Sequence, residues 1–140
     1  TKAVLGVHVT KASGTLASSA IPVFTVAGGQ VMITSMYLLV TTSITLDAGT
    51  VALQNNPTTG DTVTLVTATT LGTTDVLAGT VIGLTQGTTA ASAFLVGGRH
   101  DIGWVIPVGQ VEILPASANG AVTIGVTWVP LTSGATLVAA

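Results

Sequence analysis

Residues 121–130 read AVTIGVTWVP, and this stretch decides the class of fold. Its even-numbered positions from 122 to 128 hold Val, Ile, Val and Trp, whereas the odd-numbered positions from 123 to 127 hold Thr, Gly and Thr. Successive side chains of a strand point to opposite faces, so this alternation predicts a β-strand with one face toward a core. We expect Trp128 on the inner face.

The composition of the whole chain supports the same class. Thr is the commonest of the 140 residues, with 26 copies, and there are 17 Gly. β-branched residues lose side-chain freedom in a helix but fit a pleated sheet. Gly supplies turns and costs about 1 kcal/mol inside a helix. These observations predict an all-β protein.

Other strands are predicted where apolar residues alternate between Gly, Pro, Asn and Asp turns. They are expected over residues 3–10, 20–26, 31–42, 50–54, 62–70, 81–84, 90–96, 102–108 and 111–114. Eight to ten short strands at such spacings are typical of a β-sandwich or jelly roll. A chain of 140 residues is the size of one domain, so we expect a single β-sandwich over residues 1–140.

Residues 31–42 form the most apolar stretch, with apolar side chains on both faces. Val31, Ile33, Tyr37 and Leu39 are expected on one face. Such a strand is central in a sheet, or has one face at a subunit interface. The small, polar residues 11–19 predict a loop or an extended arm. We expect residues 1–20 and 131–140 to include arms that reach neighbouring subunits.

The chain has very few charges. Only 6% of its residues are Asp, Glu, Lys or Arg, against about 25% in an ordinary domain. Mean hydropathy is +0.80, yet the best apolar window is interrupted by Thr34 and Ser35, whereas a membrane-spanning helix needs about 20 apolar residues. We expect no membrane partner. Lys2, Lys11 and Arg99 are too few basic residues to neutralise several phosphates, so nucleic acid is not an expected partner either.

Reactive groups are sparse. The absence of Cys excludes disulfides, thiolate catalysis and zinc–cysteine sites, and no phosphate-binding or serine-hydrolase motif is present. Arg99, His100 and Asp101 form the only concentration of reactive groups in the sequence. His100 is a candidate general base oriented by Asp101, or a metal ligand together with His8. Adjacent strand residues diverge, however, and a metal needs a third ligand. The preferred interpretation is a loop that contacts a partner, in a non-enzyme without metal or cofactor.

Aromatic residues provide a test for sugar binding, because carbohydrate modules stack sugars on exposed rings. The five large aromatic side chains all lie in apolar runs, which favours a role in the core: Phe24, Tyr37, Phe94, Trp104 and Trp128. Phe94 and Trp104 lie nearest to predicted loops. Glu112, the sole Glu, lies between Val111 and Ile113 and is expected on a solvated face or in an ion pair between subunits.

The last third of the chain carries a resemblance to a known group of proteins. The segments that carry it are IPVG at 106–109, VEI at 111–113, NGAV at 119–122, WVPL at 128–131 and GATLVAA at 134–140. Together they resemble small structural proteins of tailed bacteriophages, namely head decoration or cement proteins. The ending W-V-P-L-x-x-G-A-x-L-x-A is the most distinctive part, and the match covers about 35 residues, a small part of one domain.

The resemblance implies a β-sandwich subunit that assembles as a homotrimer on the capsid surface of a virion. Such a protein binds the major capsid protein and bridges capsomers through many non-covalent contacts. Alternatives left open are a head-fibre, tail or minor capsid subunit, and a carbohydrate-binding jelly roll. The start Thr1-Lys2-Ala3 has no features of a secretion signal, so synthesis in the host cytoplasm is expected.

Overall fold

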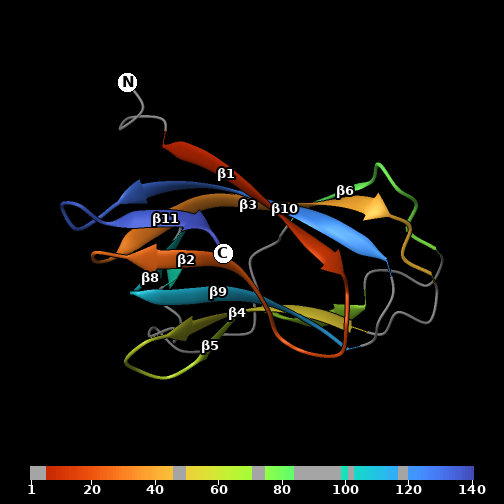
Figure 1. Cartoon of the computed structure of the whole chain (residues 1–140), viewed down its shortest axis with the longest axis horizontal. Helices are drawn as coiled ribbons and strands as arrows, with labels where there is room; N and C mark the ends of the chain where they lie inside the picture. The colour runs from red at the N-terminus through yellow and green to blue at the C-terminus, as the bar shows by residue number, and fades with distance from the viewer. Residues whose placement is uncertain (1–5, 46–49, 71–74, 84–98, 101–102, 117–119) are drawn as a thin grey trace.

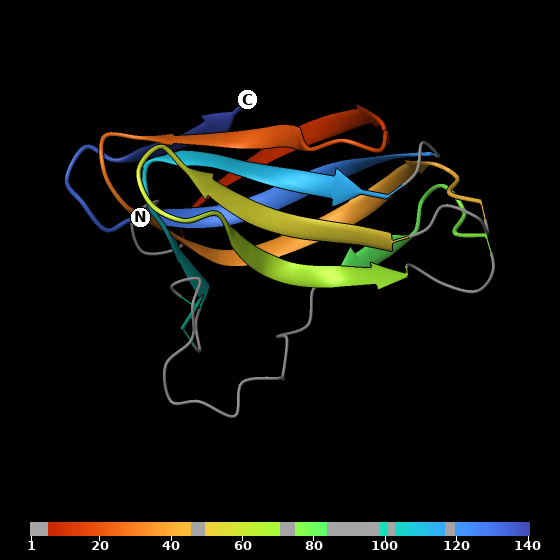
Figure 2. The ribbon, with the colours of Figure 1, turned by 90° about the horizontal axis from the view of Figure 1, so that it is seen from below.

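The computed structural model describes residues 6–45, 50–70, 75–83, 99–100, 103–116 and 120–140. Within them the chain is all-β, with two antiparallel sheets packed as layers (Figures 1 and 2). Sheet A has the order β1 (Val7–Thr15), β10 (Ala121–Pro130), β3 (Val31–Thr42), β8 (Gly103–Ile106) and β7 (Arg99–His100), with β6 (Val81–Gly83) also paired to β3. Sheet B has the order β11 (Thr136–Ala139), β2 (Ile21–Ala27), β9 (Gly109–Pro115), β4 (Thr50–Pro57) and β5 (Val63–Thr70).

The predicted all-β sandwich is confirmed. Eleven strands lie in the described residues rather than eight to ten, because β7 and β11 were not predicted as strands. The strand expected over residues 90–96 lies outside the described residues. The strand expected over residues 50–54 is longer than predicted, since β4 continues to Pro57. Gly109 and Gln110, which lie between two predicted strands, are the beginning of β9, since both residues pair with β2 and β4.

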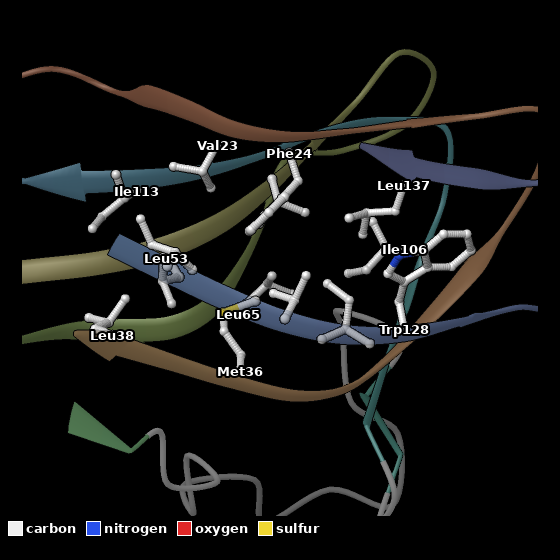
Figure 3. Close-up of a cluster of buried hydrophobic side chains, with 14 of the residues drawn as sticks. Val23, Phe24, Met36, Leu38, Leu53, Leu65, Ile106, Ile113, Trp128 and Leu137 are labelled. Carbon is white, nitrogen blue, oxygen red and sulfur yellow. The ribbon is translucent and has the colours of Figure 1, made fainter. Parts of the chain in front are cut away.

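One hydrophobic core fills the space between the two sheets. Figure 3 shows side chains from both sheets meeting there, with Phe24 and Leu137 of sheet B near Ile106 and Trp128 of sheet A. The inner positions of β10 are buried as predicted, and its Trp128 is only 8% exposed. Burial of apolar surface on this scale stabilises the fold by about 25 cal/mol per Å². The alternation in residues 121–130 therefore identified a central strand of the molecule correctly.

β3 is also a central strand, but its alternation is interrupted. Its register on β10 shifts by one residue at Thr34, between the pairs that involve Ile33 and Ser35. An extra residue in one strand reverses the face that later side chains meet. Positions 36, 38 and 40 are therefore buried, while Tyr37 and Leu39 lie half-buried on the outer face. The prediction that placed Tyr37 with Ile33 on one face, and in the core, is wrong.

The described part of the N-terminal segment is a strand rather than a free arm. Residues 7–15 pair with β10 along one edge of sheet A, with a second bulge between Ala12 and Thr15. At this bulge the buried Ser13 hydroxyl accepts a hydrogen bond from the Val122 amide at 3.1 Å. Residues 11–15, which were expected in a loop or arm, thus belong to the sheet because a side chain replaces a lost backbone partner.

The C-terminal segment, also a candidate arm, folds back onto its own domain. β11 pairs with β2 at the edge of sheet B, and Leu137 is buried. The adjacent turn is tight, since a Cβ on Gly28 would lie 2.7 Å from the carbonyl oxygen of Gly134. The Lys11 ammonium donates to the carbonyl oxygen of Ala140 and so links edge strands β1 and β11. Residues 131–140 therefore complete the sandwich.

Candidate interaction surfaces

The predicted Arg99–His100–Asp101 cluster is only partly described. Arg99 and His100 form β7, the outermost strand of sheet A, and pair with Trp104 and Gly103 of β8. The expected loop is thus a strand at these two positions. Asp101 lies outside the described residues. The backbone places Arg99 and His100 at an edge of sheet A.

His8, the other candidate metal ligand, bonds to an aromatic residue instead. Its Nε2 lies 3.0 Å from the hydroxyl of Tyr37, and the two rings stack. Among the described residues, no group of three or more His, Asp or Glu side chains could hold a metal ion. In the same part of the chain, no helix is long and apolar enough to cross a membrane.

The aromatic side chains divide between core and surface. Phe24 and Trp128 are core residues, as predicted, and Trp104 is half-buried against the core. Tyr37 is the exception, since it lies on the outer face of sheet A. Phe94 lies outside the described residues. A scan of the sequence missed Tyr37 because the bulge that reverses its face leaves no clear signal in the pattern.

Glu112 faces outward from β9, yet it is almost entirely covered. It is 6% exposed, and its Oε1 accepts a hydrogen bond of 2.6 Å from the Gln54 side-chain amide on β4. The prediction of a solvated face is therefore wrong. The two residues are direct cross-strand partners, so the sheet itself brings the amide to the carboxylate.

The outer surface of the described residues is nearly uncharged. Only two acidic side chains are exposed, Asp61 in the β4–β5 turn and Asp75 before β6. The outer face of sheet A carries Thr, Ser, aliphatic and aromatic side chains from β1, β10, β3 and β6, together with glycine backbone. Several large apolar side chains are also exposed: Val7, Leu77, Val81, Val108, Leu131 and Val138.

One end of the sandwich gathers four turns. We call it the hairpin end after the β4–β5 hairpin, and the other three turns connect one sheet to the other. It comprises residues 28–30, 58–62, 107–108 and 131–135, which lie at the left in Figures 1 and 2. Hydrogen bonds tie these turns in pairs. Leu131 donates its amide to Gln30 at 2.9 Å, and Thr58 donates its amide to Val108 at 2.9 Å. Because the turns brace one another, the exposed Leu131 and Val108 side chains are held on a rigid support.

The residues that carry the phage resemblance serve the fold. Trp128, Ala135 and Leu137 of the distinctive ending are buried, and Pro130 ends β10. Of the large apolar side chains in this ending, Leu131 and Val138 are exposed. These residues thus belong to β10 of sheet A, to β11 of sheet B and to the connection by which the chain passes from one sheet to the other.

Compared with known proteins, the chain matches no family model, no curated protein and no solved structure. Function is therefore inferred from the residues and geometry of the chain itself. The described residues offer surfaces suited to contact with other molecules: a neutral outer sheet face and a rigid hairpin end with exposed apolar side chains.

Proposed function

We propose that the chain is a structural subunit of a bacteriophage virion, which binds the outside of the capsid as a decoration or cement protein. The observation that carries the proposal is the neutral surface, on which exposed apolar side chains accompany only two exposed acidic groups in the described residues. Depletion of charge is characteristic of the core of a protein interface. The resemblance of residues 128–140 to phage decoration proteins supports the same assignment.

The hairpin end is the surface we assign to the capsid. Leu131 is 47% exposed and Val108 is 39% exposed, and a shell protein that covers both would remove apolar area from water. The braced turns are already ordered, so little conformational entropy is lost on docking. A homotrimer would present three hairpin ends at once, and linked contacts strengthen attachment without requiring a strong single site.

Co-sedimentation with capsids tests this assignment. The shells are assembled from the major capsid protein of the phage that encodes this chain, and the pellet is assayed for the chain. Leu131→Glu and Val108→Glu should each weaken binding about tenfold or more, since each places a charge in an apolar contact.

Val138→Glu, on the outer face of sheet B, is the matched control and should sediment like the unmodified protein. Sedimentation that is lost equally in all three variants would point to a general effect of added charge and would contradict the assignment of the hairpin end. Failure of the unmodified chain to sediment would contradict the proposed function itself.

A further inference from the structure

The outer face of sheet A carries a pair of nearly parallel rings. The proposed contact with the capsid, at the hairpin end, does not involve these rings. The pair consists of His8 on β1 and Tyr37 on β3, with β10 between them. The ring centroids are 5.9 Å apart, the ring planes differ by 9°, and Nε2 of His8 lies 3.0 Å from the Tyr37 hydroxyl. The hydrogen bond joins the edges of two nearly parallel rings whose centroids are offset from each other, and we call this pair the ring platform.

Gly125 explains why the platform is flat. It is the direct partner of Tyr37 across the β10–β3 ladder. A Cβ on Gly125 would lie 2.2 Å from Cζ of Tyr37 and 2.4 Å from both Cε1 and the hydroxyl oxygen. These nearly equal distances place such a Cβ over the face of the Tyr37 ring. One face of Tyr37 therefore rests on the Gly125 backbone, and the opposite face is directed away from the sheet.

The surroundings of the platform are neutral and rich in hydroxyl groups. By register, Thr10 of β1 lies beside Gly125, while Thr127 lies between His8 and Ser35. Thr10 and Ser35 are exposed, and Thr127 is half-buried. The imidazole of His8 contacts the Tyr37 hydroxyl through Nε2, and its ring carries a second nitrogen, Nδ1. The site thus combines an apolar ring face with donors and acceptors at its rim.

We infer that the ring platform is a binding site for a neutral sugar ring of a glycan. The C–H bonds on one face of a pyranose carry partial positive charge, which suits the negative face of an aromatic ring. The sugar hydroxyls at the ring edge then meet Thr, Ser and imidazole groups. A nucleobase would stack equally well, but its phosphates need basic side chains. The one described basic residue on β1, Lys11, is bonded to Ala140.

This inference is independent of the capsid role. It also differs from the sugar-binding alternative predicted from the sequence, for which Phe94 and Trp104 were the rings nearest to predicted loops. Trp104 is half-buried against the core, whereas His8 is exposed and Tyr37 is half-buried above Gly125. The ring platform is therefore the better candidate for stacking in the described part of the chain.

Saturation-transfer NMR with three soluble neutral probes tests the inference: cellotetraose, maltotetraose and mannotetraose. At least one probe should receive saturation from the protein, strongest at the axial C–H protons of one ring face. Tyr37→Leu, which keeps an apolar side chain over Gly125, should weaken binding about tenfold, the size expected for loss of one stacking contact. His8→Ala should weaken it as well, while Val138→Ala on the other sheet should leave it unchanged.

Two results would overturn the inference. One is the absence of transfer to all three probes from the unmodified protein. The other is binding by both Tyr37→Leu and His8→Ala that equals binding by the unmodified protein. Because His8 is exposed, His8→Ala should fold and decide the question even if Tyr37→Leu does not fold. If these variants only lower thermal stability, without a change in sugar binding, the platform serves the fold alone.

Discussion

At Gly125, even one added methyl group should lower the stability of the protein. Gly125→Ala places a Cβ within 2.2 Å of the Tyr37 ring, so the ring must leave its place and the contact with His8. We expect a loss of about 1–3 kcal/mol in the free energy of unfolding, as for other overpacked sites. Urea denaturation measures the loss, and the near-ultraviolet circular dichroism of tyrosine should change with it.

Gly83→Ala is the matched control for this substitution. Gly83 pairs with Tyr37 from the opposite side, on β6, and a Cβ there would meet nothing within 4 Å. It should change stability by less than about 1 kcal/mol, with a gain or a loss equally acceptable. Equal losses for the two substitutions would show that close contact with Tyr37 is not what requires glycine at position 125.

The Gln54–Glu112 pair leads to a second prediction at the residue scale. Gln54→Ala removes the amide that donates to a carboxylate which is only 6% exposed. A buried acceptor without its partner costs about 1–3 kcal/mol, so the free energy of unfolding should fall by that amount. In a Glu112→Leu background, Gln54→Ala should lower the free energy of unfolding by clearly less. Equal costs in the two backgrounds, measured as a double-mutant cycle, would contradict the role assigned to the pair.

Individual residues show why prediction from sequence succeeded at some positions and failed at others. Trp128 was placed correctly because residues 121–130 alternate without interruption through the inner face. Tyr37 was misplaced because one extra residue at Thr34 reverses the faces beyond it. Glu112 was expected in solvent because a pattern of alternation records direction only. It does not record that a neighbouring strand supplies Gln54 to cover the carboxylate.

At the scale of elements, substitutions in β11 test whether this segment packs as an edge strand or is a flexible arm. Leu137 is 1% exposed, and its neighbour Val138 is 53% exposed. Leu137→Ala should lower the free energy of unfolding by about 2–4 kcal/mol, because it leaves a cavity in the core. Val138→Ala should cost less than about 0.5 kcal/mol. Chemical denaturation of the two variants compares them directly, and equally small losses would mean that residues 131–140 do not pack as a strand.

The strands also differ in how well the sequence pattern predicts their bounds. Residues 31–42 match the bounds of β3 because a long apolar run is bounded by Gly on one side and polar residues on the other. Residues 11–15 of β1 and residues 136–139 of β11 were expected in loops or arms because each segment offers too few alternating apolar residues to identify a strand. Their pairing depends on partners distant in the chain, such as Ser13 with Val122, and a local pattern cannot contain that information.

At the scale of the whole molecule, the shortage of charge predicts how any association responds to salt. Exposed charges in the described residues are few, so screening has little to act on. We expect a trimer with a mass of about 41 kDa, three times the chain mass of 13.8 kDa, whose stability changes little between low and high sodium chloride. Light scattering after gel filtration at both salt concentrations measures the mass. A stable monomer, or a trimer that dissociates in high salt, would contradict this picture of a neutral apolar interface.

The central claim is that this β-sandwich is a structural protein of the capsid exterior, and an image reconstruction of the purified phage particle tests it most directly. We expect density on the outer surface of the shell that fits the two described sheets, with the hairpin end and its Leu131 directed toward the capsid protein. A reconstruction in which the outer surface of the shell has no such density would contradict the claim.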